Sequence, residues 1–318
     1  MDAGPPAAVS AVFRLGQALE RLGSGPGGIS ERCAPSAERR GDLRLGSASP
    51  TARWLLVEQP GGWGSDALLE STLDRTVGAE LLRRWEDGAG IRVLLIRRPG
   101  RRPAPARRAW AVVDSRAGRE RVGWGSWERP DELLDLPVGA DAGEPGGPLY
   151  LVCAHGRHDA CCAIRGRPVA QSLEAARPGA VWECSHIGGD RFAANVVALP
   201  HGLFYGHVTP ATAPAVATAY EQGEVRTDLL RGRSAFAPPA QAAQHHARLA
   251  LGETRVDALR PLGMAALADR TWRVRLAAPG GALLVTVRAA LGAPVRLTCS
   301  SIRAERPRTW ELLRLERA

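Results

Sequence analysis

The feature that most constrains the fold is an order of expected secondary structure that occurs twice along the chain. In the first half, an apolar strand at Trp54–Val57 precedes a helical pattern at 66–85. Strand patterns follow at 91–96, 109–113 and 122–127. The second half again runs strand, helix, strand, strand, strand. Because helices between strands return the chain across a sheet, the sequence predicts two α/β units of related topology.

The second unit ends with an additional helix. Its expected elements are strands at 149–152, 180–185, 195–199 and 203–205, and helices at 160–176 and 211–221. The order βαβββα is that of a thioredoxin-like unit, in which helices cover a mixed sheet. We therefore expect one thioredoxin-like unit over residues 51–140 and another over residues 147–226, with a Gly- and Pro-containing linker at 139–147.

The two ends of the chain are expected to lie outside these units. Residues 1–50 are rich in Gly, Pro, Ser and Ala, which predicts a flexible segment with one amphipathic helix, Val9–Leu22. Residues 227–318 are expected to form a small appended α+β segment. Its predicted elements are a helix at 239–251, whose His245 and His246 are expected to be solvated, and strands at 272–276, 283–287, 295–299 and 310–315. The expected class is therefore α/β, at the border with α+β.

All of the positive charge comes from arginine. The chain has 318 residues, and its 42 basic residues, none of them lysine, exceed its 33 acidic residues to give a net charge of +9. Reactions that need a lysine, such as Schiff-base formation, are therefore excluded. The first residues lack a signal-peptide pattern, and no apolar run reaches the roughly 18 residues of a membrane span. We expect a cytoplasmic protein without membrane association.

Four of the six cysteines lie in one short segment. They are Cys153, Cys161, Cys162 and Cys184, whereas the other two lie near the ends of the chain. In a reducing compartment, clustered thiols are more often metal ligands or redox groups than disulfides. The chemistry of the chain is therefore expected in this segment.

Four residues of the segment are candidate metal ligands. Cys153 follows an expected strand, Cys162 opens the next helix, and His186 and Asp190 follow the next strand. Because these strand ends and this helix start meet at one edge of the unit, the four side chains can surround one centre. Thiolates and imidazoles bind iron–sulfur clusters or zinc, whereas carboxylates are rarer at iron–sulfur clusters. The helix N-terminus would lower the pKa of the Cys162 thiol and favour the metal-binding thiolate.

Other residues of the segment have alternative interpretations. Cys161 is either an alternate ligand or a packing residue, and Cys184 is an alternate ligand that we interpret as a core residue. Asp190 is either a ligand or the ion-pair partner of Arg191 or Arg157. The remaining polar residues and glycines are expected to fix the loops around the ligands or to let the backbone approach a metal group. They are His155, Arg157, His158, Asp159, Gly188, Gly189 and Arg191.

Two motifs of this segment resemble those of a known family. They are Cys-x-His-Gly-x-x-Asp-x-x-Cys, beginning at Cys153, and Ser-His-x-Gly-Gly-Asp-Arg-Phe-Ala-x-Asn, beginning at Ser185. Both are similar to motifs of the sucrase/ferredoxin-like family, a thioredoxin-like ferredoxin branch. The similarity is clearest over residues 147–210 and extends more weakly to Trp54–Gly64 and Leu230–Arg233.

The resemblance implies a [2Fe–2S] cluster held by two cysteines and two histidines in a His-x-x-x-His spacing. Cys153, Cys162 and His186 fall on three of these positions, but the fourth is Asp190. This departure leaves three alternatives: an aspartate ligand, replacement by another cysteine of the segment, or loss of the cluster. The family name does not imply glycosidase activity, because the sequence offers no carboxylate pair in a glycosidase setting.

We therefore expect an iron–sulfur electron carrier rather than an enzyme, working with a redox partner protein. The arginines at 97–108 are interpreted as a solvated loop, with docking of an acidic redox partner as the alternative. Nucleic-acid binding is disfavoured because interleaved aromatic residues are missing. The alternative functions are a structural zinc protein with an interaction role and a thiol-redox protein, the latter disfavoured by the absence of Cys-x-x-Cys.

Overall fold

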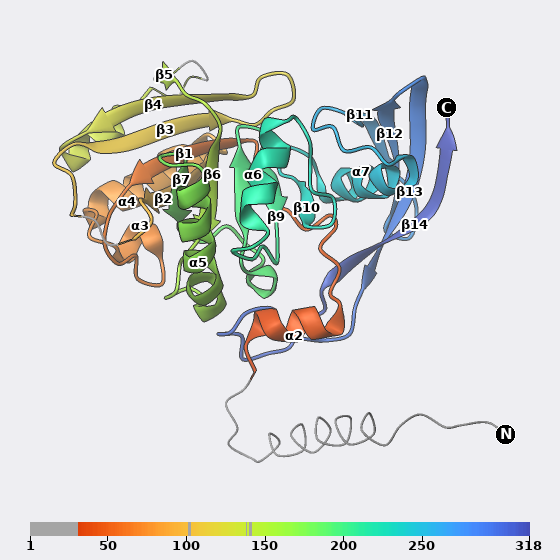
Figure 1. The fold of residues 1–318 in the computed structure, drawn as a ribbon, viewed down its shortest axis with the longest axis horizontal. Helices are drawn as coiled ribbons and strands as arrows, with labels where there is room; N and C mark the ends of the chain where they lie inside the picture. The colour runs from red at the N-terminus through yellow and green to blue at the C-terminus, as the bar shows by residue number, and fades with distance from the viewer. Residues whose placement is uncertain (1–30, 101–102, 138, 140–141) are drawn as a thin grey trace, which may run out of the picture. The chain divides into compact units, whose positions relative to one another are not determined.

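The computed structural model describes residues 31–100, 103–137, 139 and 142–318. Of these, Cys33–Ala318 form one compact unit. The described residues form a ten-stranded mixed sheet, a four-stranded antiparallel sheet and six α-helices (Figure 1). The predicted mixed α/β class is confirmed, and the predicted helix Val9–Leu22 lies outside the described residues.

The first half of the large sheet is built around β1 (Arg53–Glu58). This strand pairs in parallel with β2 (Arg92–Arg97) and antiparallel with β3 (Arg108–Asp114), which pairs with β4 (Arg121–Trp127). The short 3₁₀ helix η2 (Pro130–Leu134) follows β4. The crossover from β1 to β2 consists of α3 (Ala67–Glu70), α4 (Arg75–Leu81) and the π-helical turn η1 (Leu82–Gly88).

The second half has the same pairing around β6 (Leu149–Cys153). This strand pairs in parallel with β7 (Val181–Cys184) and antiparallel with β8 (Val196–Leu199), which pairs with β9 (Leu203–Tyr205). The strand order and directions of the first half are therefore repeated in the second. Its helices are α5 (Ala160–Ala176), between β6 and β7, the 3₁₀ turn η3 (Asp190–Phe192), and α6 (Ala213–Glu221), after β9.

The two halves join into one sheet through β2 and β7. These strands pair antiparallel, with Ile96 opposite Cys184. The resulting strand order is β10-β9-β8-β6-β7-β2-β1-β3-β4-β5, with β10 (Leu230–Arg233) and β5 (Glu144–Pro145) at the edges. Because the junction lies between the two parallel pairs, the carboxyl end of β7 lies beside strands of the other half.

The large sheet has buried side chains on both of its faces. On one face, aromatic residues of the two halves meet: Trp54 stacks on Phe204 and Trp124 on Trp182. On the other face, alternate side chains of the strands pack against α3 and α4 in the first half and against α5 and α6 in the second. Alternation along each strand therefore buries both faces, which explains the nearly continuous apolar runs in the sequence.

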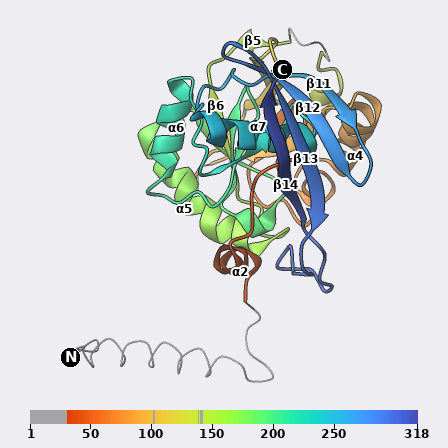
Figure 2. The same ribbon diagram turned by 90° about the vertical axis from the view of Figure 1, so that its right-hand side faces the viewer.

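The C-terminal part forms the second, antiparallel sheet. Its core packs α7 (Pro238–Leu251) against the sheet (Figures 1 and 2). The loop between its last two strands, residues 292–307, extends toward α2 (Cys33–Arg40), as Figure 1 shows. The strands are β11 (Pro261–Ala266), β12 (Thr271–Ala278), β13 (Gly281–Leu291) and β14 (Arg308–Arg317).

Two local predictions from the sequence were wrong, and two strands were missed. The helix expected at 66–85 is divided, because the carboxylates of Asp66 and Asp74 each accept backbone N–H groups and begin a separate helix. The strand expected at 295–299 is a loop with a single bridge between Val295 and Glu305. The strands β10 and β11 had not been predicted. None of the helices in the described residues has the length and apolar character that a bilayer crossing requires.

Candidate metal centre

The four predicted ligands come together at the carboxyl edge of the second half. The Sγ atoms of Cys153 and Cys162 and a ring nitrogen of His186 lie within 4.8 Å of one another. The Asp190 carboxylate lies beside them, with Oδ1 3.2 Å from Cys162 Sγ and 3.1 Å from His186 Nδ1. We call Cys153, Cys162, His186 and Asp190 the first centre. The two cysteines and Asp190 are buried, whereas the His186 side chain is 24% exposed.

The four candidate ligands meet here because of the βαβ crossover between β6 and β7. Cys153 is the last residue of β6, and Cys162 lies in the first turn of α5, which begins where the Asp159 carboxylate accepts the Cys161 N–H. His186 follows the end of β7, whose Cys184 lies opposite Cys153 in the sheet. Parallel strands end at the same edge of a sheet, and the returning helix starts there as well.

The turn that carries His186 and Asp190 is held by four hydrogen-bond donors from other segments. Arg92 donates to the carbonyl of His186 at 2.8 Å, and Ser49 donates to that of Ile187 at 3.0 Å. The carbonyl of Gly188 accepts from Arg231 at 2.8 Å, and that of Gly189 accepts from the Asn195 amide at 2.9 Å. Four consecutive carbonyls are therefore fixed, and the turn presents its two candidate ligands from a rigid backbone.

Gly188 and Gly189 are required by this packing. Both have left-handed backbone conformations, with φ of 89° and 84°. A Cβ at Gly188 would lie 2.5 Å from Ser49 Oγ, and one at Gly189 would lie 2.4 Å from the Arg231 guanidinium. The sequence attributed these glycines to close approach of a metal group, whereas the structure shows close approach of neighbouring side chains.

Charge at the first centre is shared between sulfur, imidazole and carboxylate. A hydrogen bond from Cys162 lowers the pKa of Cys153, and the same contact raises the pKa of Cys162. Burial lowers the pKa of His186, but the facing Asp190 carboxylate and Cys153 sulfur outweigh it and raise the pKa to about 9. The Cys153 sulfur is therefore the stronger candidate for a thiolate.

His155 and His158 lie against the His186 ring. The Nδ1 of His155 accepts the backbone N–H of His186 at 3.3 Å, so its Nε2 donates to the carbonyl of Gly64 at 2.8 Å. The His158 ring stacks on the His186 ring at 3.7 Å between centroids, with Nε2 3.8 Å from Asp190 Oδ2. His155 thus ties the loop after β1 to the first centre, and His158 covers it toward solvent.

Three other residues singled out in the sequence, Arg157, Arg191 and Cys184, do not belong to the first centre. Arg191 forms an ion pair with Asp42 at 3.3 Å, and Arg157 is exposed. The predicted alternative pairing of Asp190 with either arginine is therefore wrong, because the carboxylate faces inward to His186 and Cys162. Cys184 is fully buried in the apolar core, in agreement with its interpretation as a core residue.

A second group of metal-ligand types lies behind the first centre. Cys33, Asp159, Cys161 and Cys299 have ligand atoms within 4.8 Å of one another, and the group could hold a metal. We call these four residues the second centre. Cys161, predicted as an alternate ligand of the first centre, belongs here, because adjacent residues of a helix start point in different directions. A hydrogen bond from Cys33 lowers the pKa of Cys161 to about 6.

Sequence reasoning missed the second centre. Cys33 and Cys299 are 266 positions apart, and neither has a neighbouring histidine or cysteine that would mark a ligand motif. The only signal in the sequence was that these two are the remaining members of a small set of six cysteines.

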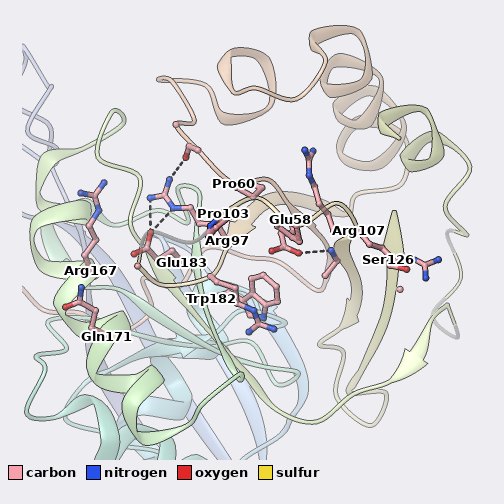
Figure 3. Close-up of a pocket in the computed structure, with 18 residues that line it drawn as sticks. Glu58, Pro60, Arg97, Pro103, Arg107, Ser126, Arg167, Gln171, Trp182 and Glu183 are labelled. Carbon is pink, nitrogen blue, oxygen red and sulfur yellow. Dashed lines mark hydrogen bonds and ion pairs between the residues drawn. The ribbon is translucent and has the colours of Figure 1, made fainter. Parts of the chain in front are cut away.

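An arginine-lined pocket of 1330 Å³ lies on the other side of the loop after β1 (Figure 3). Arg97 pairs with Glu183 at 2.8 Å and lies 4.1 Å from the centre of the Trp63 ring. The Trp63 ring packs edge-on against His155, so the Trp63 and His155 rings lie between Arg97 and the first centre. Further arginines at its wall are Arg98, Arg107, Arg108 and Arg167.

Fold and site together define a mixed α/β protein with buried Cys and Asp side chains and a partly buried His that could hold a metal. The chain belongs to the sucrase/ferredoxin-like family, whose model matches residues 44–232. The match includes the whole first centre but neither Cys33 nor Cys299. Searches of curated proteins and of solved structures gave no match.

Proposed function

We propose that this protein is an electron carrier that holds a [2Fe–2S] cluster at the first centre, with Cys153, Cys162, His186 and Asp190 as ligands. The observation that carries this proposal is the convergence of these four side chains on one buried point. When bound, such a cluster takes up and releases one electron at a time. Membership of the sucrase/ferredoxin-like family supports the same assignment.

The donor set suits such a group. The two sulfurs are the usual ligands of iron–sulfur clusters, and imidazole nitrogen replaces thiolate in known mixed sites. The buried Nδ1 of His186 faces Asp190 Oδ1 at 3.1 Å, so this nitrogen and this carboxylate, both of which can bind metals, already lie side by side.

The protein around the first centre is arranged to bury and compensate negative charge. Arg231 is 2% exposed, and burial lowers its pKa to about 9, while the nearby Asp190 carboxylate favours its charged form. The Arg92 guanidinium is held against the carbonyl of His186. Positive charge fixed beside a redox group favours its reduced form, so we expect these arginines to raise the reduction potential.

We further propose that each half of the large sheet is a thioredoxin-like unit. The support is the repeated pairing of β1–β4 and β6–β9 with a crossover between the two parallel strands. The crossover of the second half supplies Cys162 at its helix start. In this interpretation only the second unit carries ligands, and the first supplies supporting side chains such as Arg92.

The arginine-lined pocket is our proposed docking surface for an acidic redox partner. Arginines outnumber acidic residues along its wall; Arg167 extends from α5, and Arg107 from the residue before β3. The Trp63 and His155 rings lie between the pocket and the first centre. Complementary charge would steer an acidic partner to this side of the molecule.

Analysis of iron, sulfide and absorption in anaerobically purified protein tests the cluster. We expect about two irons and two sulfides per chain, visible absorption, and an EPR signal on reduction. Cys153→Ser should lose them, whereas the control Cys184→Ala, which alters a buried cysteine outside the first centre, should keep them. Colourless protein whose zinc disappears in Cys153→Ser would instead establish the zinc alternative.

Electron exchange with small charged reagents tests the docking surface. Ferricyanide should oxidise the reduced protein faster than a cationic oxidant of similar driving force, and added salt should reduce the difference. Arg107→Glu combined with Arg167→Glu should slow the ferricyanide reaction several-fold and leave the absorption spectrum unchanged. Equal rates in the variant and the wild type would place the electron exit elsewhere.

A further inference from the structure

We propose that the second centre binds one Zn²⁺ through the sulfurs of Cys33, Cys161 and Cys299 and the carboxylate of Asp159, and that this ion fastens both ends of the compact unit to α5. The site is distinct from the first centre, with which it shares no ligand. Two of its four residues lie outside the part of the chain that the family model matches.

The spacing of the donor atoms is close to that of a tetrahedral zinc site. The sulfur of Cys299 lies 3.5 Å from the sulfurs of both Cys161 and Cys33. Asp159 Oδ2 lies 3.6 Å from the sulfur of Cys33. Zinc–sulfur bonds of about 2.3 Å at tetrahedral angles separate two sulfurs by about 3.8 Å. Small side-chain adjustments therefore suffice to admit the ion.

The chemistry of the donors favours zinc. Three thiolates and one carboxylate provide four ligands with no open position, which is the arrangement of structural zinc sites. A set dominated by sulfur disfavours calcium and magnesium, which prefer oxygen. Cys33, Cys161 and Asp159 are each at most 2% exposed, so once formed the site is shielded from water.

The carboxylate of Asp159 is already oriented for this role. Its Oδ1 accepts the backbone N–H of Cys161 at 2.8 Å, and its Oδ2 accepts that of Cys299 at 2.6 Å. Hydrogen bonds of this kind commonly fix the carboxylate ligands of metal ions. Because the Cys33 thiol also donates to its Oδ2, at 3.6 Å, Asp159 contacts all three cysteine-bearing segments without the ion.

The ion would close two long loops of the chain. Cys33 begins α2, Cys161 lies in the first turn of α5, and Cys299 lies in the 292–307 loop between β13 and β14. Several hydrogen bonds of that loop are internal, such as those from Arg296 to the carbonyls of Ser301 and Cys299. A shared metal ion therefore explains why an otherwise exposed loop ends against α5.

The second centre also bears on the first. Cys161 and Cys162 are adjacent, so an ion bound to Cys161 holds the helix turn that carries Cys162. We expect zinc removal to accelerate loss of iron from the first centre on exposure to air. This consequence rests on the proposed function, whereas zinc binding itself does not.

Metal analysis of the full chain and its variants tests the site. We expect one zinc per chain in the anaerobically purified protein, lost in Cys299→Ala and Cys33→Ala but retained in Cys153→Ser and in the control Cys184→Ala. Iron, in contrast, should be lost in Cys153→Ser. Zinc retained in Cys299→Ala, or zinc lost in Cys153→Ser, would overturn the proposal whether or not the protein binds iron.

A measurement on the wild-type protein avoids any effect of the substitutions on folding. Alkylation mapped by mass spectrometry should modify Cys299, the most exposed of the three thiols, at least ten-fold faster after zinc chelation. X-ray absorption at the zinc edge should show three sulfurs and one lighter donor. Unchanged alkylation, no bound zinc, or a disulfide between these cysteines in anaerobically purified protein would contradict the proposal.

Discussion

Asp190 lies between two other candidate ligands, a cysteine sulfur and an imidazole nitrogen. Its carboxylate is 2% exposed and contacts both Cys162 and His186, while the arginine next to it in the sequence turns away to Asp42. Burial alone would raise the pKa of the Asp190 carboxyl group, but the facing His186 outweighs burial and lowers it. Asp190 is therefore charged at neutral pH. The Asp190 carboxylate is therefore paired with His186 and Cys162 rather than with an arginine.

Substitution of Asp190 tests its role in the first centre. We expect Asp190→Ala to lose most of its iron, because one ligand is removed. Asp190→His should retain the cluster and raise its reduction potential, because neutral imidazole replaces a negative ligand. Iron analysis and a redox titration measure both effects. If Asp190→Ala kept the wild-type spectrum and potential, Asp190 would not be a ligand.

His245 on α7 makes stability depend on pH. The sequence predicts a solvated side chain, but the ring is largely buried, and burial lowers its pKa from 6.5 to about 4. The positive charges of the facing groups His246, Arg44 and Arg248 also lower the pKa of His245. As the pH falls below 6.5, the unfolded chain binds a proton before the folded one, so the folded state loses stability down to about pH 4.

We therefore expect His245→Gln to weaken this pH dependence. Between pH 7.5 and 5, the free energy of unfolding of the variant should fall by about 1–2 kcal/mol less than that of the wild type. Urea unfolding at the two pH values measures the difference. His207, whose pKa burial also lowers to about 4, and the other histidines whose pKa burial lowers, His155, His201 and His246, remain in both proteins and contribute to the residual dependence. Identical slopes in the two proteins would show that His245 titrates normally.

At the scale of elements, capping decides where the helices of the first half begin. The Asp74 carboxylate accepts the N–H groups of Thr76 and Val77 at 2.8 and 3.1 Å, and α4 then directs Val77 and Leu81 into the core. A continuous apolar pattern predicted one helix, but a cap after Leu73 favours a new start. The capping residues therefore override the apolar periodicity in this crossover.

Asp74→Ala should destabilise the protein by about 1 kcal/mol, because two backbone N–H groups lose their acceptor. Asp74→Ser should recover most of the loss, since serine also caps helices. Asp87→Ala, an exposed aspartate in the neighbouring π-helical turn, is the matched control and should change stability by less than about 0.5 kcal/mol. Chemical denaturation compares the four proteins. Equal losses in the two alanine variants would exclude a specific capping effect.

At the scale of the whole molecule, Arg231 connects three segments that are far apart in the sequence. It donates to the carbonyls of Ser47 and Gly188 and to Asn195 Oδ1, at 2.6, 2.8 and 2.8 Å. The side chain is buried among Phe192, Phe204 and the glycine turn of the first centre. The edge strand β10, the segment before β1 and the first centre are therefore held by one guanidinium.

We expect Arg231→Met to destabilise the protein by about 3 kcal/mol or more, because three buried acceptors lose their donor. Arg226→Met, which removes a partly exposed ion pair with Asp228, should cost less than about 1 kcal/mol. Urea unfolding measures both. Similar losses in the two variants would indicate that Arg231 contributes no more than a surface residue.

The repeated order of elements and the grouping of the four candidate ligands could be predicted from the sequence. Alternating and helical apolar patterns are local, and so is the pairing of motif residues with strand ends and a helix start. Cys153, Cys162, His186 and Asp190 could therefore be placed together from one crossover. The motif marked Asp159 as a loop-fixing residue, and the structure shows that it caps the start of α5.

Only the tertiary structure decided which distant residues meet. Cys33 and Cys299 reach Cys161 because α2 and the 292–307 loop converge on the start of α5, which no local pattern encodes. Arg231 and Arg92 hold the ligand turn because β10 and β2 pack beside it. Burial and long-range pairing depend on how whole elements pack, since a residue's spacing along the chain says nothing about a partner more than 100 positions away.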